Sequence, residues 1–151
     1  MYSIINQKQI TNAPAETLIM TTEPIKVLCV DDNAVIALGM QVAIDDDPGM
    51  RCVGCLYRAD ELTSEVERSH PDVVVLDARM PGKAPMDALR ELSASHPDVR
   101  VIIFSGFDDA AAVGQAVEAG ARGYVSKRGD TDDVLEAIRA VIRGEFAHST
   151  A

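Results

Sequence analysis

A run of four apolar residues, Val73-Val74-Val75-Leu76, leads directly into Asp77, and Pro81 follows soon after. Three of the four are β-branched, which is typical of a strand buried on both faces of a parallel sheet. Pro81 disfavours continuation of the strand, so Asp77 should stand at its carboxyl end, where a loop begins. Ligands of open parallel α/β sheets bind outside that edge. The run therefore predicts a parallel sheet with a functional carboxylate at its edge.

Strand-like apolar runs alternate with helix-like amphipathic segments along most of the chain. The predicted strands cover residues 25–30, 51–57, 72–77, 100–104 and 123–126, and the predicted helices cover residues 34–44, 60–69, 87–95, 110–119 and 131–143. Because parallel strands need helical crossovers, this order predicts an α/β fold. We expect a doubly wound five-stranded parallel sheet with five helices and the flavodoxin-like strand order 2-1-3-4-5. The first helix carries apolar residues at Val35, Leu38 and Val42, and the last has a buried stripe of Val134, Leu135, Ile138, Val141 and Ile142.

The length of 151 residues favours a single domain. We place it at residues 25–145, between a flexible N-terminal extension at 1–24 and a C-terminal tail or start of a linker at 146–151. A formal net charge of −10 argues against direct binding to nucleic acid or to an anionic membrane. The sequence contains neither a membrane-length apolar run nor a signal-peptide pattern, so we expect a cytoplasmic protein.

Two cysteines, Cys52 and Cys55, have the Cys-x-x-Cys spacing of a redox pair. Such a motif should open a helix, whereas this one falls within a predicted strand. Cys29 also falls in a predicted strand, where a buried free thiol is the ordinary expectation. We therefore interpret all three cysteines as structural.

His70 and His96 each begin a His-Pro-Asp-Val segment that separates a predicted helix from a predicted strand. A histidine in the last turn of a helix interacts favourably with the helix dipole, and the proline ends the helix. This structural role is favoured over metal binding. For Asp45-Asp46-Asp47, a solvated loop is favoured over a cation site.

Four of the predicted strands end in residues suited to phosphoryl transfer. These are Asp31 and Asp32 after the first strand, Asp77 after the third, Ser105 and Gly106 after the fourth, and Lys127 after the fifth. The predicted fold places all of them on one rim. Crowded carboxylates repel one another unless a cation compensates, and Mg²⁺ prefers such oxygen ligands. Lys127 adds a fixed positive charge, while the Ser105 hydroxyl and the Gly106 N–H can donate to phosphoryl oxygens.

This set resembles the receiver domain of response regulators in bacterial two-component signalling, over roughly residues 25–145. The resemblance implies that Asp77 is the phosphoacceptor, phosphorylated by a sensor histidine kinase or phosphotransfer protein. It also implies that Asp32 binds Mg²⁺ directly, that Asp31 does so through water, and that Asp77 and the Arg79 carbonyl complete the protein ligands. The run 119–124, Ala-Gly-Ala-Arg-Gly-Tyr, is most similar to NarL/FixJ-type receivers.

By the same resemblance, Ser105 and Tyr124 are the switch residues. An acyl phosphate on Asp77 would draw Ser105 inward and vacate space into which Tyr124 turns. The responding face is formed by the helix at 110–119, the strand at 123–126 and the helix at 131–143. Activation is expected to allow homodimerisation through this face, or through the first and last helices.

The implied function is that of a signalling domain that catalyses only its own phosphorylation and dephosphorylation, most simply the receiver part of a DNA-binding transcriptional regulator. A stand-alone receiver that acts through protein contacts or in a phosphorelay is the alternative. A Mg²⁺-dependent aspartyl phosphohydrolase is less favoured, because that class uses Asp-x-Asp and Asp31 and Asp32 are adjacent.

Three departures from the receiver pattern concern loops near the predicted site. Lys83-Ala84-Pro85 resembles an insertion after Met80-Pro81-Gly82, Ala88 replaces a usual glycine, and Arg128 stands where many receivers have proline. Arg79 and Phe107 occupy positions that flank the route of the hydrolytic water in receivers. Since neither side chain readily activates water, we expect them to prolong the lifetime of the acyl phosphate.

Overall fold

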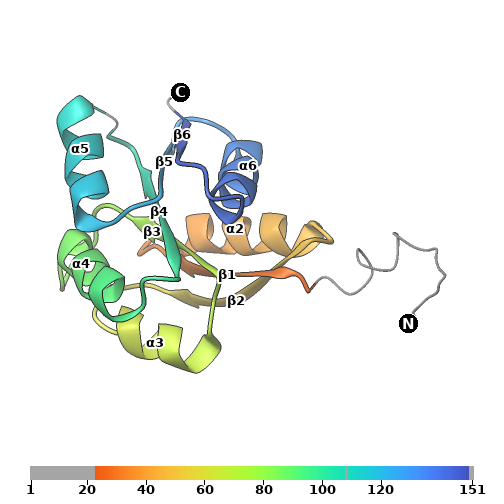
Figure 1. The fold of residues 1–151 in the computed structure, drawn as a ribbon. Helices are drawn as coiled ribbons and strands as arrows, with labels where there is room; N and C mark the ends of the chain where they lie inside the picture. The colour runs from red at the N-terminus through yellow and green to blue at the C-terminus, as the bar shows by residue number, and fades with distance from the viewer. Residues whose placement is uncertain (1–22, 108, 150–151) are drawn as a thin grey trace, which may run out of the picture.

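The computed structural model describes residues 23–107 and 109–149 (Figure 1). The predicted extension at residues 1–24 therefore lies outside the described residues, apart from Glu23 and Pro24. The strands are β1 (Ile25–Val30), β2 (Met50–Leu56), β3 (Val73–Asp77), β4 (Arg100–Ser105), β5 (Gly123–Ser126) and β6 (Ala147–Ser149). The helices are α2 (Ala34–Asp46), α3 (Leu62–Ser69), α4 (Pro85–Ser95), α5 (Ala110–Ala119) and α6 (Thr131–Ile142). None of these helices of the described part is both long and apolar enough to cross a membrane.

All neighbouring strands are parallel, and the strand order is β2-β1-β3-β4-β5-β6. The predicted order 2-1-3-4-5 is confirmed, but the predicted number of strands is wrong. Part of the segment predicted as a tail forms β6, which pairs with β5 from Gly123↔Ala147 to Val125↔Ser149. Gly144, at φ 87°, turns the chain after α6 and allows this return. A three-residue strand is too short to show a hydrophobic period, so the sequence pattern did not reveal it.

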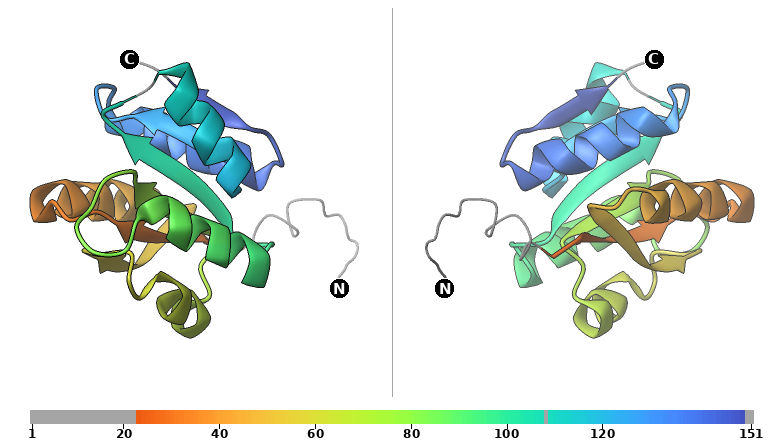
Figure 2. Two further views of the ribbon diagram at one scale, coloured as in Figure 1. Left: turned by 90° about the vertical axis from the view of Figure 1, so that its left-hand side faces the viewer. Right: turned by 90° about the vertical axis from the view of Figure 1, so that its right-hand side faces the viewer.

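Two helical layers cover the sheet, with α3, α4 and α5 on one face and α2 and α6 on the other (Figures 1 and 2). Side chains alternate along each strand, so β3 directs Val74 and Leu76 toward the first layer and Val73 and Val75 toward the second. Burial on both faces explains why this strand consists almost entirely of large apolar residues.

Helix α2 leaves exposed the three apolar residues that were named for it from the sequence. Its buried residues are Ala37, Met40 and Ile44, whereas Val35, Leu38 and Val42 are 79%, 60% and 60% exposed. Apolar residues lie all around this helix, so periodicity alone could not identify its inner face. In α6, by contrast, the predicted residues Val134, Ile138 and Val141 are buried, and Leu135 and Ile142 are partly buried.

The two His-Pro segments close helices, as predicted. The backbone N–H of His70 donates to Val66 O at the end of α3, and that of His96 donates to Leu92 O at the end of α4. His70 adopts the left-handed conformation, at φ 50° and ψ 55°, which is common at the end of a helix.

The Asp45–Asp47 segment differs from the predicted solvated loop. Asp45 lies in the last turn of α2, and its carboxylate accepts a hydrogen bond from the N–H of Cys52 at 2.8 Å. Asp47 forms an ion pair with Arg139 of α6. These contacts hold the end of α2 against β2 and α6.

Candidate functional site

The predicted site residues meet at the carboxyl edge of the sheet. Asp31 directly follows β1, Asp77 ends β3, Ser105 ends β4 and Lys127 directly follows β5. Strands β1 and β3 are neighbours, although β2 lies between them in the chain. This is the point at which the winding of the sheet reverses and where ligands of such folds bind.

Lys127 connects the acidic residues of the site. Its Nζ lies 3.0 Å from Asp31 Oδ2 and 3.2 Å from Asp77 Oδ1. Its backbone N–H donates to Ser105 O at 2.8 Å, which ties the end of β5 to β4. Burial alone would lower the pKa of Lys127, but the adjacent carboxylates of Asp31 and Asp77 raise it above its ordinary value. Lys127 is therefore a permanent cation at neutral pH.

The Asp77 carboxylate is buried, with 5% of the residue exposed. Burial raises the pKa of Asp77 above its ordinary value, and the negative charge of Asp31 acts in the same direction. A hydrogen bond from the Arg79 N–H to Oδ1, at 3.2 Å, opposes this shift, as does Lys127. The result is a poorly solvated carboxylate with a fixed orientation, as a nucleophile requires.

Three carboxylates could hold a metal ion. One oxygen from each of Asp31, Asp32 and Asp77 lies within 4.8 Å of the others. Asp31 Oδ1 accepts a hydrogen bond from the Asn33 N–H at 2.9 Å, whereas Oδ2 is buried and accepts no well-aligned hydrogen bond although Lys127 is close. Since three acids here face one lysine, their oxygens suit a hard divalent cation such as Mg²⁺. In residues 23–107 and 109–149 this is the only such cluster of three acid, histidine or cysteine groups.

The two predicted switch residues both bind the backbone of Phe107. The Ser105 hydroxyl oxygen accepts a hydrogen bond from the Phe107 N–H at 2.9 Å, and the Tyr124 hydroxyl donates to the Phe107 carbonyl. Ser105 and Tyr124 are each only 2% exposed, so Tyr124 is already in a buried position. Both line a cavity of about 140 Å³ next to Ala112 and Ala116 of α5. The role of the Phe107 backbone was not predicted from the sequence.

The predicted lifetime residues contact each other. The Arg79 guanidinium carbon lies 3.8 Å from the centre of the Phe107 ring, a cation–π contact between the β3–α4 and β4–α5 loops. Phe107 is 52% exposed. Gly106 directly precedes Phe107, and the space that a side chain would fill there is open. Arg79 and Phe107 each lie two residues beyond a predicted site residue, Asp77 and Ser105.

The segment that resembles an insertion packs near the start of α3. The N–H of Lys83 donates to Asp60 Oδ1 at 3.2 Å, and its Nζ pairs with Glu91 of α4. Gly82 has φ 87°, and a side chain there would collide with Arg58 and Asp60. Pro85 is the first residue of α4, a position that suits proline because no helical N–H bond is lost.

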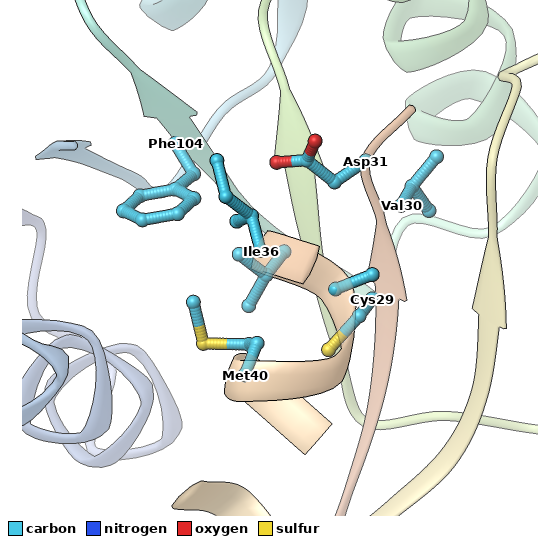
Figure 3. Close-up of a pocket in the computed structure, with 8 residues that line it drawn as sticks. Cys29, Val30, Asp31, Ile36, Met40 and Phe104 are labelled. Carbon is cyan, nitrogen blue, oxygen red and sulfur yellow. The ribbon is translucent and has the colours of Figure 1, made fainter. Parts of the chain in front are cut away.

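Apolar side chains lie behind Asp31. A cavity of about 10 Å³ lies between the end of β1 and α2. Figure 3 shows Ile36, Met40 and Phe104 among the side chains that line it. A space of this size and character is too small for a ligand and too apolar for water. Its apolar walls keep water from one side of the Asp31 carboxylate.

Comparisons with known proteins identify the family of this chain. The family model for the response regulator receiver domain matches residues 27–139. The response regulator GacA of Pseudomonas syringae pv. syringae (strain B728a) is 32% identical over 121 residues, which cover 80% of this chain and 56% of GacA. The chain thus spans about half the length of such relatives.

Solved structures of response regulators also match this chain. A two-component response regulator of the LuxR family from Aurantimonas sp. SI85-9A1 matches with a TM-score of 0.78 and 30% identity, covering 83% of this chain and 89% of that one. The signal receiver domain of NarL from Mycobacterium tuberculosis matches with a TM-score of 0.77 and 25% identity, over 82% of this chain and 98% of that one. The resemblance predicted from the sequence is confirmed, and the chain belongs to the response regulator receiver domain family.

Proposed function

We propose that this chain is a phosphorylation-activated receiver in which Asp77 accepts a phosphoryl group from the phosphohistidine of a sensor kinase or phosphotransfer protein. The observation that carries the proposal is the buried Asp77 carboxylate, held by Lys127 at 3.2 Å beside the acidic pair Asp31 and Asp32. Such a protein would act in the cytoplasm, where two-component kinases present their phosphohistidine.

In the proposed step, a carboxylate oxygen of Asp77 attacks the phosphorus atom. The phosphorus–nitrogen bond breaks, its electron pair stays on the imidazole of the donor, and that imidazole takes up a proton. Lys127 neutralises charge on the phosphoryl oxygens, and the Arg79 N–H holds the carboxylate in place. When bound by Asp31, Asp32, Asp77 and the Arg79 carbonyl, Mg²⁺ would supply further positive charge beside the transferred group.

The hydrogen bonds of Phe107 support a switching function. A phosphoryl group on Asp77 competes for the Ser105 hydroxyl, which at present accepts from the Phe107 N–H. The Tyr124 hydroxyl binds the carbonyl of the same residue, so a movement of this loop changes the surroundings of Tyr124. Switching then reaches the face formed by α5, β5 and α6 through one short loop, and a bias of a few kcal/mol is enough.

We further propose that the chain is the receiver part of a DNA-binding transcriptional regulator, with a stand-alone or phosphorelay receiver as the alternative. The support is that GacA, a response regulator, is almost twice as long as the matched region. Homodimerisation on activation has two candidate surfaces. One is the α5–β5–α6 face, and the other is the exposed apolar stripe of Val35, Leu38 and Val42 on α2, near α6.

Phosphotransfer is tested by incubating the full chain with acetyl phosphate and Mg²⁺ and weighing the intact protein. Wild type should gain one phosphoryl group, and Asp77→Asn should gain none. Asp46→Asn, an exposed site in α2, is the matched control and should behave as wild type. Equal uptake by wild type and Asp77→Asn would reject the assignment of the phosphoacceptor.

A further inference from the structure

Three cysteines lie on the same face of the sheet because of an irregularity in β2. The register of β1 and β2 pairs Val27 with Cys52 and then Leu28 with Gly54, so Val53 is an extra residue. Residues three apart in a regular strand point to opposite faces, but one extra residue restores the same face. Cys52 and Cys55 accordingly pack against the same core cluster as Cys29, on the side of α2 and α6.

The three thiols differ in their access to solvent. Cys29 is buried, with 2% exposed, whereas Cys52 and Cys55 are partly exposed. Cys55 lines an open surface cleft of about 290 Å³, together with Tyr57, Arg58 and Glu61. A small solute can therefore reach Cys55 from solvent but not Cys29.

The protonation of the thiols also differs. The neighbouring Cys29 thiol lowers the pKa of Cys55 to about 6. The neighbouring thiols of Cys52 and Cys55, together with burial, raise the pKa of Cys29 far above its ordinary value. These opposite directions favour the thiolate on Cys55 over a thiolate on Cys29, and the thiolate is the reactive form of cysteine.

We propose that Cys55 and Cys29 form a peroxide-reactive pair that closes a reversible disulfide between β2 and β1. The Cys55 sulfur attacks hydrogen peroxide, forming a sulfur–oxygen bond while the oxygen–oxygen bond breaks and hydroxide leaves. The Cys29 sulfur then attacks the Cys55 sulfenic acid, forming the disulfide as the sulfur–oxygen bond breaks. The second hydroxide leaves; the Cys29 thiol proton converts one hydroxide to water, and a proton from solvent converts the other.

Strand geometry selects Cys29 as the partner of Cys55. They are register partners on adjacent strands, which lie about 4.8 Å apart, within the usual Cα separation of a disulfide. Cys52 and Cys55 pair with Val27 and Cys29, two positions apart on β1, so about 6.6 Å separates their Cα atoms, which is close to the upper limit for a disulfide. A preformed metal site is disfavoured, because in the described residues the cysteine sulfurs form no cluster with all ligand atoms within 4.8 Å.

The pair is tested on the reduced full chain by adding hydrogen peroxide and mapping the cysteine-containing peptides by mass spectrometry without reduction. Wild type should lose two hydrogen atoms and yield a peptide pair linking Cys29 to Cys55, and thiol reductant should reverse the change. Cys52→Ser is the matched control and should form the same link. Cys55→Ser, at a partly exposed position that tolerates substitution, should form no link.

Cys29→Ala should stop at the sulfenic acid, which dimedone would trap on Cys55. Circular dichroism shows whether Cys29→Ala folds. If this variant does not fold, the sulfenic acid on Cys55 is instead trapped with dimedone in wild type at early times. A disulfide through Cys52, or thiols that remain unmodified in folded wild type at peroxide concentrations that oxidise free cysteine, would overturn the proposal.

Discussion

The guanidinium carbon of Arg79 lies 3.8 Å from the centre of the Phe107 ring, so two loops that leave neighbouring strands are joined by side chains beside Asp77. Water that hydrolyses an acyl phosphate must approach in line with the bond that breaks. The contact brings together a long cation and an apolar ring, two residues beyond Asp77 and Ser105 respectively.

Phe107→Ala and Arg79→Ala should each speed the loss of phosphate from Asp77, on the order of tenfold, because either change opens the path of the water. Since the side chains touch, the double variant should be little faster than the faster single variant. Decay is followed by intact mass after removal of the phosphodonor. Phe146→Ala, at another exposed phenylalanine, serves as the control. Unchanged decay in both single variants would exclude shielding by this pair.

For the metal, Asp32→Ala should weaken Mg²⁺ binding by about tenfold or more, and Asp31→Ala should weaken it less. Asp32 is exposed, whereas the Asp31 carboxylate is already shared by Lys127 and the Asn33 N–H. Titration calorimetry of the unphosphorylated protein measures both affinities. Asp46→Ala should bind Mg²⁺ as wild type does. An affinity unchanged by Asp32→Ala would remove Asp32 from the ligands.

Asp77→Asn should stabilise the unphosphorylated protein at neutral pH by about 1 kcal/mol, the usual size of a single-site effect. Burial raises the pKa of Asp77 in the folded state. An acid with a raised folded pKa destabilises the fold above that pKa, and this cost disappears as the pH falls through it. The gain in melting temperature should therefore be largest at neutral pH and shrink in acid. A gain that grows on acidification would contradict the assigned direction.

Two glycines at the ends of helices allow a matched test of packing. Gly120 has φ 116°, and a Cβ there would lie 2.8 Å from Ser93 Cβ, whereas Gly144 has φ 87° and open space. Gly144→Ala should lower the free energy of unfolding by about 1 kcal/mol, because alanine is strained in the left-handed conformation. Gly120→Ala should cost roughly 2–3 kcal/mol, because the collision with Ser93 is added. Thermal unfolding measures the stability of both variants. Equal losses of stability would show that the Ser93 side chain moves aside without cost.

The sheet was largely predictable because its strands are apolar on both faces. The strand Val73-Val74-Val75-Leu76 is apolar on both faces, so it can be buried only between two helical layers. Asp77 at its carboxyl end then lies close to the residues that follow the neighbouring strands. The approach of Asp31 and Lys127 to Asp77 follows from chain topology, so the sequence order was sufficient to anticipate it.

Features that depend on a single residue of register or on loop geometry were not predictable. The extra residue Val53 moves the Cys55 side chain to the opposite face of the sheet. The apolar pattern of β2 does not reveal this extra residue, because it looks like that of a regular strand. Likewise, the hydrogen bonds of Ser105 and Tyr124 to the Phe107 backbone depend on a loop conformation that side-chain types do not encode.

The short strand β6 changes what the neighbouring edge of the sheet can do. Its three residues take up the hydrogen-bonding edge of β5. The rings of the exposed His148 and of Tyr124 are nearly perpendicular, with 6.4 Å between their centroids. An open strand edge recruits strands from other molecules and promotes aggregation and domain swapping, and a very short polar edge strand suppresses both. A second copy that docks on this side therefore cannot extend the sheet through β5, because β6 already occupies that edge.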